Sequence, residues 1–223
     1  MGEEAPARFL FEGKSYEFLD SGAYSFLYRE YPNSLRAIKI IYRRESHPID
    51  EFVAAADQEV RLQKRAAEFN LAPQIYASGF IPKNDFYFIQ MDFYGPENGW
   101  VHVWSGEPEM DAIFCEFVRK LVFEARLYNS FDPNAHFYYH PHLGLRMIDY
   151  GKCQEVEPGQ EAVRYQQMTN ALELNCPQPL AGGRTKKRTK KRTKKKKRVK
   201  KSRRTHARSH LRSRFKSKRR VYF

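Results

Sequence analysis

The basic residues of this 223-residue chain are crowded into its C-terminal end. Of its 40 Lys and Arg residues, 23 lie from Arg184 onward, where no Asp or Glu occurs, whereas residues 1–183 hold the other 17 and all 26 acidic residues. The first part therefore carries a formal charge of −9 and the second one of +23. Because such a dense run of like charges repels itself and has little to bury, we predict a disordered tail over 181–223.

The first 180 residues are enough for one hydrophobic core. The chain has no apolar stretch of membrane-spanning length and no signal-peptide pattern after Met1. Its three cysteines, Cys115, Cys153 and Cys176, are scattered and odd in number, which indicates reduced thiols rather than a disulfide framework. We therefore expect an intracellular protein with no membrane partner.

Three extended, aromatic segments open the folded part, at 16–19, 24–28 and 35–42. They are typical of antiparallel strands, and Gly22 lies in the turn between the first two. A small residue there would let backbone N–H groups approach an anion. An ordinary hairpin glycine is the alternative, and Gly22 taken alone favours it.

Lys39 interrupts the apolar run of the third segment, and strand alternation places it on one face with Ala37 and Ile41. A lysine on the less exposed face of a strand needs an anionic partner. The alternative is an edge-strand lysine that extends to water. The next segment, 50–70, has apolar residues at helical spacing, and Glu59 lies beside its buried stripe. Held against Lys39, Glu59 would fix the amine toward a phosphate; the alternative is a glutamate that faces solvent, as most do on amphipathic helices.

Two further segments complete the pattern. An apolar strand is predicted over 86–92, which contains Met91, and a hairpin over 137–148 leads into Asp149, Tyr150 and Gly151. An apolar strand that ends on a carboxylate is a common way to present an oxygen ligand to a metal ion.

The order of these features resembles the protein-kinase fold, closest to the small, divergent Ser/Thr kinase-like proteins of large DNA viruses, over about residues 10–155. The resemblance implies an α+β protein with a kinase-like N-lobe at 1–95, made of an antiparallel sheet and one helix. A reduced helical C-lobe would follow at 96–180, with remnants of the catalytic loop and of the Asp-Phe-Gly motif. It also implies a host nucleus or cytoplasm as the location, or association with a virion.

The resemblance also implies the roles of single residues. ATP would lie against Gly22, Lys39, Glu59 and Met91, and Asp149 would bind Mg²⁺. Asp132, 17 residues before Asp149, would be the catalytic base.

The chain departs from the family at three points. Only Gly22 remains of the three glycines of the phosphate loop, and the position of the metal-binding Asn falls near His136 or Phe137. About 30 residues separate Gly151 from the tail, too few for a full substrate-binding half. Two functions therefore stay open: an active Ser/Thr kinase, or a catalytically inactive relative that serves as a nucleic-acid-binding or virion-packaging component.

The tail predicts binding to DNA or RNA without sequence preference, because dense positive charge releases counterions from a phosphate backbone. A nuclear-localisation signal and a contact with the acidic body of the same chain are the alternatives. The cations expected to carry the binding are Arg184, Lys186, Lys187, Arg188, Lys190, Lys191, Arg192, Lys194, Lys195, Lys196, Lys197 and Arg198.

Overall fold

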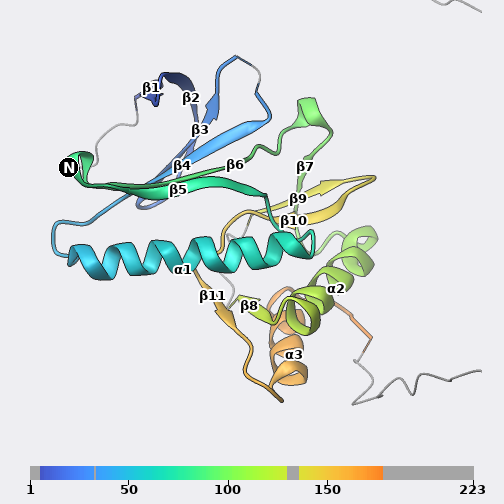
Figure 1. The fold of residues 1–223 in the computed structure, drawn as a ribbon. Coiled ribbons are helices and arrows are strands. Elements are labelled where there is room, and N and C mark those ends of the chain that lie inside the picture. Colours follow the sequence, from blue (N-terminus) through green and yellow to red (C-terminus); the bar gives the residue numbers. More distant parts are fainter. Residues whose placement is uncertain (1–5, 33, 130–135, 178–223) are drawn as a thin grey trace, which may run out of the picture. The chain divides into compact units, whose positions relative to one another are not determined.

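The computed structural model describes residues 6–32, 34–129 and 136–177, which belong to one compact unit, Met1–Gly182. This unit combines a large antiparallel sheet with helices (Figure 1), so the α+β prediction is confirmed. The predicted base Asp132 and the predicted tail at 181–223 lie outside the described residues.

A six-stranded antiparallel sheet occupies the first half of the unit, in the order β1-β2-β3-β4-β6-β5. The three predicted segments at its start are strands. The bounds are β1 (Arg8–Phe11), β2 (Lys14–Ser21), β3 (Ser25–Glu30), β4 (Arg36–Tyr42), β5 (Ile75–Ile81) and β6 (Phe86–Asp92).

One face of this sheet buries an aromatic and aliphatic cluster to which Tyr16, Tyr28, Ile38, Ile40 and Phe86 belong. The alternation along β4 sends Ile38 and Ile40 into this cluster, whereas Ile41 packs on the other side of the sheet. Lys39 therefore points away from the aromatic cluster, as the strand period predicts.

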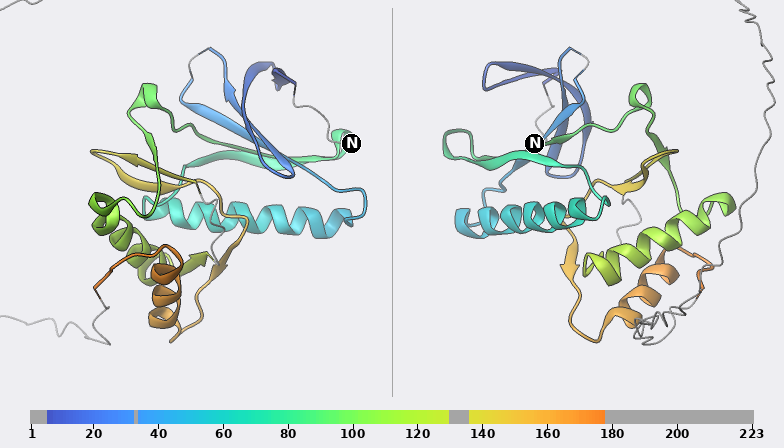
Figure 2. Two further views of the ribbon diagram at one scale, coloured as in Figure 1. Left: turned by 180° about the vertical axis from the view of Figure 1, so that it is seen from behind. Right: turned by 45° about the vertical axis from the view of Figure 1, so that its right-hand side comes forward.

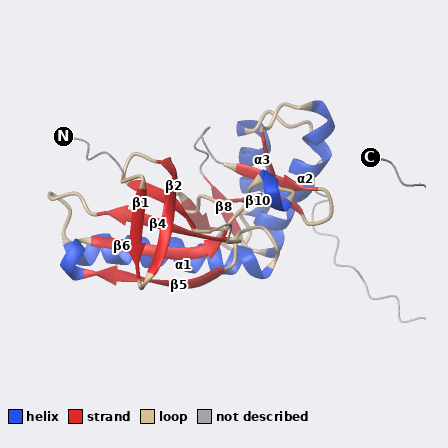
Figure 3. Ribbon diagram, turned by 90° about the horizontal axis from the view of Figure 1, so that it is seen from above, coloured by secondary structure: helices blue, strands red, loops and turns tan. Residues whose placement is uncertain are grey.

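The second face of the sheet is covered by α1 (Ile49–Glu68), which runs along β5 and β6 (Figures 1 and 3). Phe52, Ala56 and Val60 pack against Tyr87 and Ile89 of β6. These helix residues recur every four positions, so the helix predicted over 50–70 is confirmed with slightly different ends.

The second half of the unit is mixed. A hairpin of β9 (Phe137–His140) and β10 (Gly144–Met147) confirms the hairpin predicted from the sequence, and β7 (Val101–Val103) pairs with β9. A second pair joins β8 (Leu127–Asn129) to β11 (Cys153–Glu155).

The described residues of this half also form helices, which Figure 2 shows in two views. They are α2 (Asp111–Arg119), which continues as a π-helical turn over Lys120–Glu124, and α3 (Glu161–Ala171). Their apolar faces share a core with the end of α1 and with Tyr150. Short 3₁₀ turns lie at Pro82–Asn84, Pro96–Asn98 and Pro108–Met110. None of the helices in the described ranges is long and apolar enough to cross a membrane.

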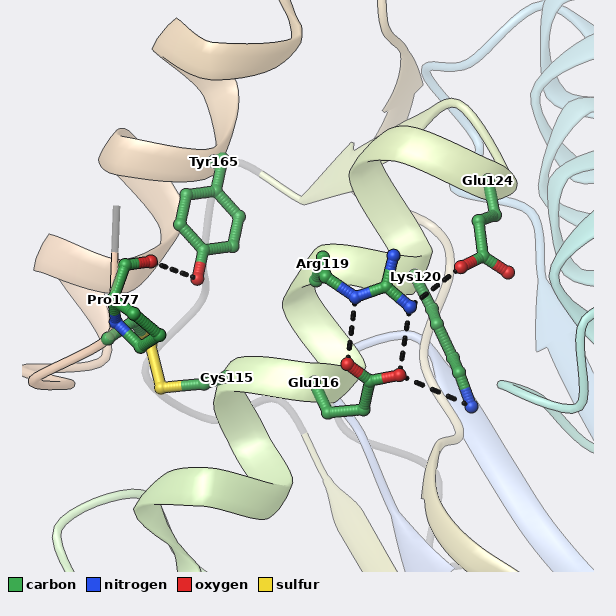
Figure 4. Close-up of polar contacts among 8 residues, drawn as sticks. Cys115, Glu116, Arg119, Lys120, Glu124, Tyr165 and Pro177 are labelled. Atoms are coloured by element: carbon green, nitrogen blue, oxygen red, sulfur yellow. Dashed lines mark hydrogen bonds and ion pairs between the residues drawn. A yellow bond between two sulfur atoms is a disulfide. The ribbon is translucent and has the colours of Figure 1, made fainter. Parts of the chain in front are cut away.

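A disulfide joins Cys115 of α2 to Cys176, which follows α3 (Figure 4). The prediction of three reduced thiols is therefore wrong for these two residues, while Cys153 is free and buried. The two half-cystines are 61 residues apart in the sequence, and they meet because α3 packs against α2. Their spacing gave no sign of this packing.

Candidate functional site

Lys39 lies in the middle of β4, between Leu27 of β3 and Ile89 of β6. Its Nζ atom is 2.7 Å from Oε1 of Glu59 and 3.7 Å from Oδ1 of Asp149. The Lys39 side chain is only 16% exposed, so its charge is largely removed from water and is balanced by these two carboxylates. The structure thus brings together three of the predicted site residues.

The ion pair fixes the charge of the lysine. Burial alone would lower the pKa of the Lys39 ammonium, but Glu59 and Asp149 outweigh burial and raise the pKa above its ordinary value of 10.5. Glu59 itself is buried on the sheet-facing side of α1. Lys39 is therefore a fixed cation with one buried and one exposed carboxylate partner.

Asp149 is the exposed member of this trio, with 53% of its side chain open to solvent. It follows β10, and the backbone N–H of Gly151 donates to its Oδ1 at 3.1 Å. A Cβ atom on Gly151 would lie 3.2 Å from Oε2 of Glu59, so a glycine keeps this approach uncrowded. Asp149 is thus the carboxylate of the trio that faces solvent, where an ion could bind.

A small cavity of about 110 Å³ opens beside this trio. Its lining residues include Lys39, Asp149, His136, Asp20 and Gly22. The N–H of Gly22 closes the hairpin by donating to the carbonyl of Ser25 at 2.7 Å, which is the role of an ordinary hairpin glycine. Gly22 therefore borders the cavity, but its own amide is engaged in the turn.

A larger cavity of about 510 Å³ adjoins the small one, since Asp20, Leu27, Met91 and Ile148 line both. Met91 is 3% exposed. Its further lining residues include Leu19, Ala37 and Pro73 and the aromatic side chains of Tyr94, Trp100, His102 and Tyr138. A flat apolar group would fit such a cavity, with its polar end toward Lys39.

Sequence reasoning missed these aromatic walls. Tyr94 and Trp100 stack with their ring centroids 4.1 Å apart, and Tyr138 packs against both Tyr94 and His102. His102 and Tyr138 meet because β7 pairs with β9, which are more than thirty residues apart in the sequence. Strand pairing at that distance leaves no local pattern to read.

His102 is the least satisfied polar group in this region. Its Nε2 atom is buried and has no hydrogen-bond partner within the described part of the chain. Burial and, to a smaller extent, His136 lower the pKa of the His102 imidazole below 6.5. The ring is therefore neutral at physiological pH and lies in the wall of the larger cavity.

Three features define the chemistry of the site: a largely buried cation, an exposed carboxylate and an adjoining cavity with aromatic walls. Such a set can hold a phosphate, a hard divalent ion and a flat ring. No cluster of three metal-ligating side chains occurs among the described residues. No model of a known protein family matches the chain, and no curated protein matches it either.

Proposed function

We propose that this chain is a kinase-like protein that binds ATP and Mg²⁺ between the large sheet and the β9–β10 hairpin. The observation that carries the proposal is the position of Lys39 between Glu59 and Asp149. In protein kinases a strand lysine must pair with a helix glutamate while an aspartate binds Mg²⁺. The sheet followed by the glutamate-bearing helix α1 supports the same fold assignment.

Each residue then has a role. Lys39 would contact the phosphates, Glu59 would orient the Lys39 amine, and the exposed carboxylate of Asp149 would bind Mg²⁺ through oxygen, which this ion prefers. Bound Mg²⁺ would neutralise charge on the transferred phosphoryl group. The nucleobase would lie against Met91 in the larger cavity.

His136 bears on how many metal ions the site can hold. It lines the small cavity near the position at which the family has an Asn ligand. Imidazole is a poor ligand for Mg²⁺, so the residues present fit one metal ion at Asp149 rather than two.

As a kinase, the protein would transfer the γ-phosphoryl group of ATP to a Ser or Thr hydroxyl. Asp132 would accept the hydroxyl proton while the acceptor oxygen bonds to the γ-phosphorus and the bond to the leaving oxygen of ADP breaks.

The second candidate function is a catalytically inactive kinase fold. The observation that favours it is Asp20, which lines both cavities and would bring a negative charge close to the phosphates. Such a protein would serve as a nucleic-acid-binding component or as a virion-packaging component. It would be located in the host nucleus or cytoplasm, or in association with a virion.

Phosphate transfer to a generic basic protein distinguishes the two functions. An active kinase transfers phosphate, and Asp149→Asn abolishes the transfer, because an amide binds Mg²⁺ far more weakly than a carboxylate does. Phosphate transfer no higher than that of a mock preparation supports the hypothesis of a catalytically inactive kinase fold. Transfer that survives Asp149→Asn contradicts the role assigned to Asp149.

We also propose that the basic residues from Arg184 to Arg198 bind DNA or RNA through the phosphate backbone. The sequence alone supports this proposal, because it has a run of cations and no acidic residue after Arg184. This binding is independent of the nucleotide site, and either proposal can hold without the other.

A further inference from the structure

The carbonyl of Leu71 accepts two hydrogen bonds from the segment that carries Asp149. The backbone N–H of Met147 donates to it at 3.0 Å, and the hydroxyl of Tyr150 donates to it at 2.9 Å. These two donors lie on either side of Asp149. Leu71 is itself fixed to the end of α1, because its N–H bonds the carbonyl of Ala66 at 3.0 Å.

Tyr150 is suited to hold this position. Its side chain is fully buried, in the core that α1 shares with α2 and α3. A buried hydroxyl has few alternative partners, so its bond to Leu71 is directional and is kept while the core is intact. The residue next to Asp149 is thereby linked to the helix that carries Glu59.

A second contact to α1 lies farther along the chain, at the residue six positions after Asp149. Glu155 of β11 pairs with Arg61 of α1, and Nη1 of Arg65 is 3.7 Å from the same carboxylate oxygen. This contact is about half exposed, so it is weaker than the buried hydrogen bond of Tyr150. The chain around Asp149 is thus tied to the end of α1 through Met147 and Tyr150 and to the body of α1 through Glu155.

We infer that Tyr150 is a positioning residue that holds Asp149 beside Lys39 and Glu59, with the Glu155–Arg61 pair as a second tether. The inference rests on the proposed function, because it assigns a purpose to the position of a Mg²⁺-binding carboxylate. A carboxylate that is held in place binds the ion without first losing conformational freedom. The site is then assembled by contacts within the chain itself.

The test compares the affinity for ADP in Mg²⁺ with the affinity for ADP in EDTA, measured by calorimetric titration of the full chain. Tyr150→Phe keeps the buried ring and removes only the hydroxyl. We expect the gain in affinity that Mg²⁺ provides to fall by roughly two- to tenfold, the range of one buried hydrogen bond. The affinity in EDTA should stay unchanged, which a general loss of structure would not allow.

Tyr165→Phe is the matched control. Tyr165 is buried in the same core, and its hydroxyl donates to the carbonyl of Pro177 at 3.3 Å (Figure 4) rather than to the segment around Asp149. The Tyr165→Phe variant should lower the melting temperature, as Tyr150→Phe does, and should leave the gain in ADP affinity that Mg²⁺ provides unchanged.

Glu155→Gln tests the second tether at an exposed position. We expect about a twofold loss of the Mg²⁺ effect, compared with none for Glu124→Gln, which removes a similar ion pair with Arg119 (Figure 4). If Tyr150→Phe does not fold, Glu155→Gln alone tests the inference. A Glu155→Gln variant in which Mg²⁺ raises the ADP affinity as much as in the parent would then overturn it.

The outcomes also separate this inference from the function on which it rests. If Mg²⁺ gives the parent protein no gain in ADP affinity, the proposed function is wrong and the inference falls with it. If the parent shows the gain and Tyr150→Phe keeps all of it, only the positioning role is wrong.

Discussion

The Nζ atom of Lys39 lies 2.7 Å from Oε1 of Glu59, although the two residues are 20 positions apart in the sequence. The pair joins the centre of the sheet to α1, and Asp149 approaches the same ammonium from the second half of the chain. A buried lysine that serves only structure needs one anionic partner. The second, exposed carboxylate is the feature that supports the proposal of a metal ion at this site.

Replacing Glu59 should destabilise the protein and weaken nucleotide binding. Glu59→Gln leaves Lys39 largely buried with Asp149 as its remaining partner, so we expect the free energy of unfolding to fall by roughly 1–3 kcal/mol. Denaturant titration measures this loss. Glu68→Gln, at an exposed position on the same helix, should change stability by less than about 0.5 kcal/mol. Equal losses in the two variants would contradict the importance of the Lys39–Glu59 pair.

The disulfide between Cys115 and Cys176 should contribute measurably to stability. It closes a loop of about 60 residues, so we expect Cys176→Ser to lower the free energy of unfolding by about 2–4 kcal/mol. Reductant should lower the melting temperature of the parent protein and leave that of Cys176→Ser unchanged. Mass spectrometry after alkylation provides the check, and three alkylated thiols in the unreduced parent would show that the disulfide is absent.

Tyr28 should limit stability at alkaline pH. Burial, followed by the nearby Tyr42, raises the pKa of Tyr28 to about 12 from its ordinary value of 10.0. Above pH 10 the unfolded chain therefore loses a proton that the folded protein keeps, so the free energy of unfolding falls as the pH rises from about 10 to 12. Tyr28 accounts for up to about 3 kcal/mol of this fall.

Tyr28→Phe tests this dependence by denaturant titration at several pH values. The variant should lose less stability above pH 10 than the parent does. At pH 7 it should be as stable as the parent, or more stable by about 1 kcal/mol, because the Tyr28 hydroxyl is buried with no hydrogen-bond partner among the described residues. An identical decline in both proteins would show that Tyr28 does not titrate as expected.

Deleting residues 183–223 should abolish binding to DNA and RNA and leave the unfolding of the remaining chain unchanged. Binding of the full chain should weaken by more than about 100-fold between roughly 50 and 200 mM salt, because counterion release drives it. Fluorescence anisotropy with labelled oligonucleotides of different sequence measures both effects. Binding by the truncated chain at full strength, or binding that is insensitive to salt, would contradict the role of the tail.

Local patterns predicted the three charged residues at the centre of the site. Lys39 interrupts a strand, Glu59 borders the apolar stripe of a helix, and Asp149 follows a hairpin. Each of these positions can be predicted from a few neighbouring residues. The aromatic walls of the larger cavity were not predicted. Trp100 and Tyr138 reach the cavity only through the pairing of distant strands, which no short-range period encodes.

The same limit explains the error about the cysteines. Cys115 and Cys176 lie on separate elements of the second half, and their meeting depends on how α2 and α3 pack. The second tether of the site, between Arg61 and Glu155, is equally non-local, since 94 residues separate its partners.

Thermal unfolding with and without ATP and Mg²⁺ tests the proposed nucleotide site most directly. We expect ATP with Mg²⁺ to raise the melting temperature of the parent protein, because a ligand that binds only the folded state stabilises it. Lys39→Met should lose this rise, whereas Lys64→Met, which removes an exposed lysine of α1, should keep it. A parent protein whose melting temperature does not respond to ATP with Mg²⁺, or a Lys39→Met variant that responds as fully as the parent, would contradict the nucleotide site at Lys39.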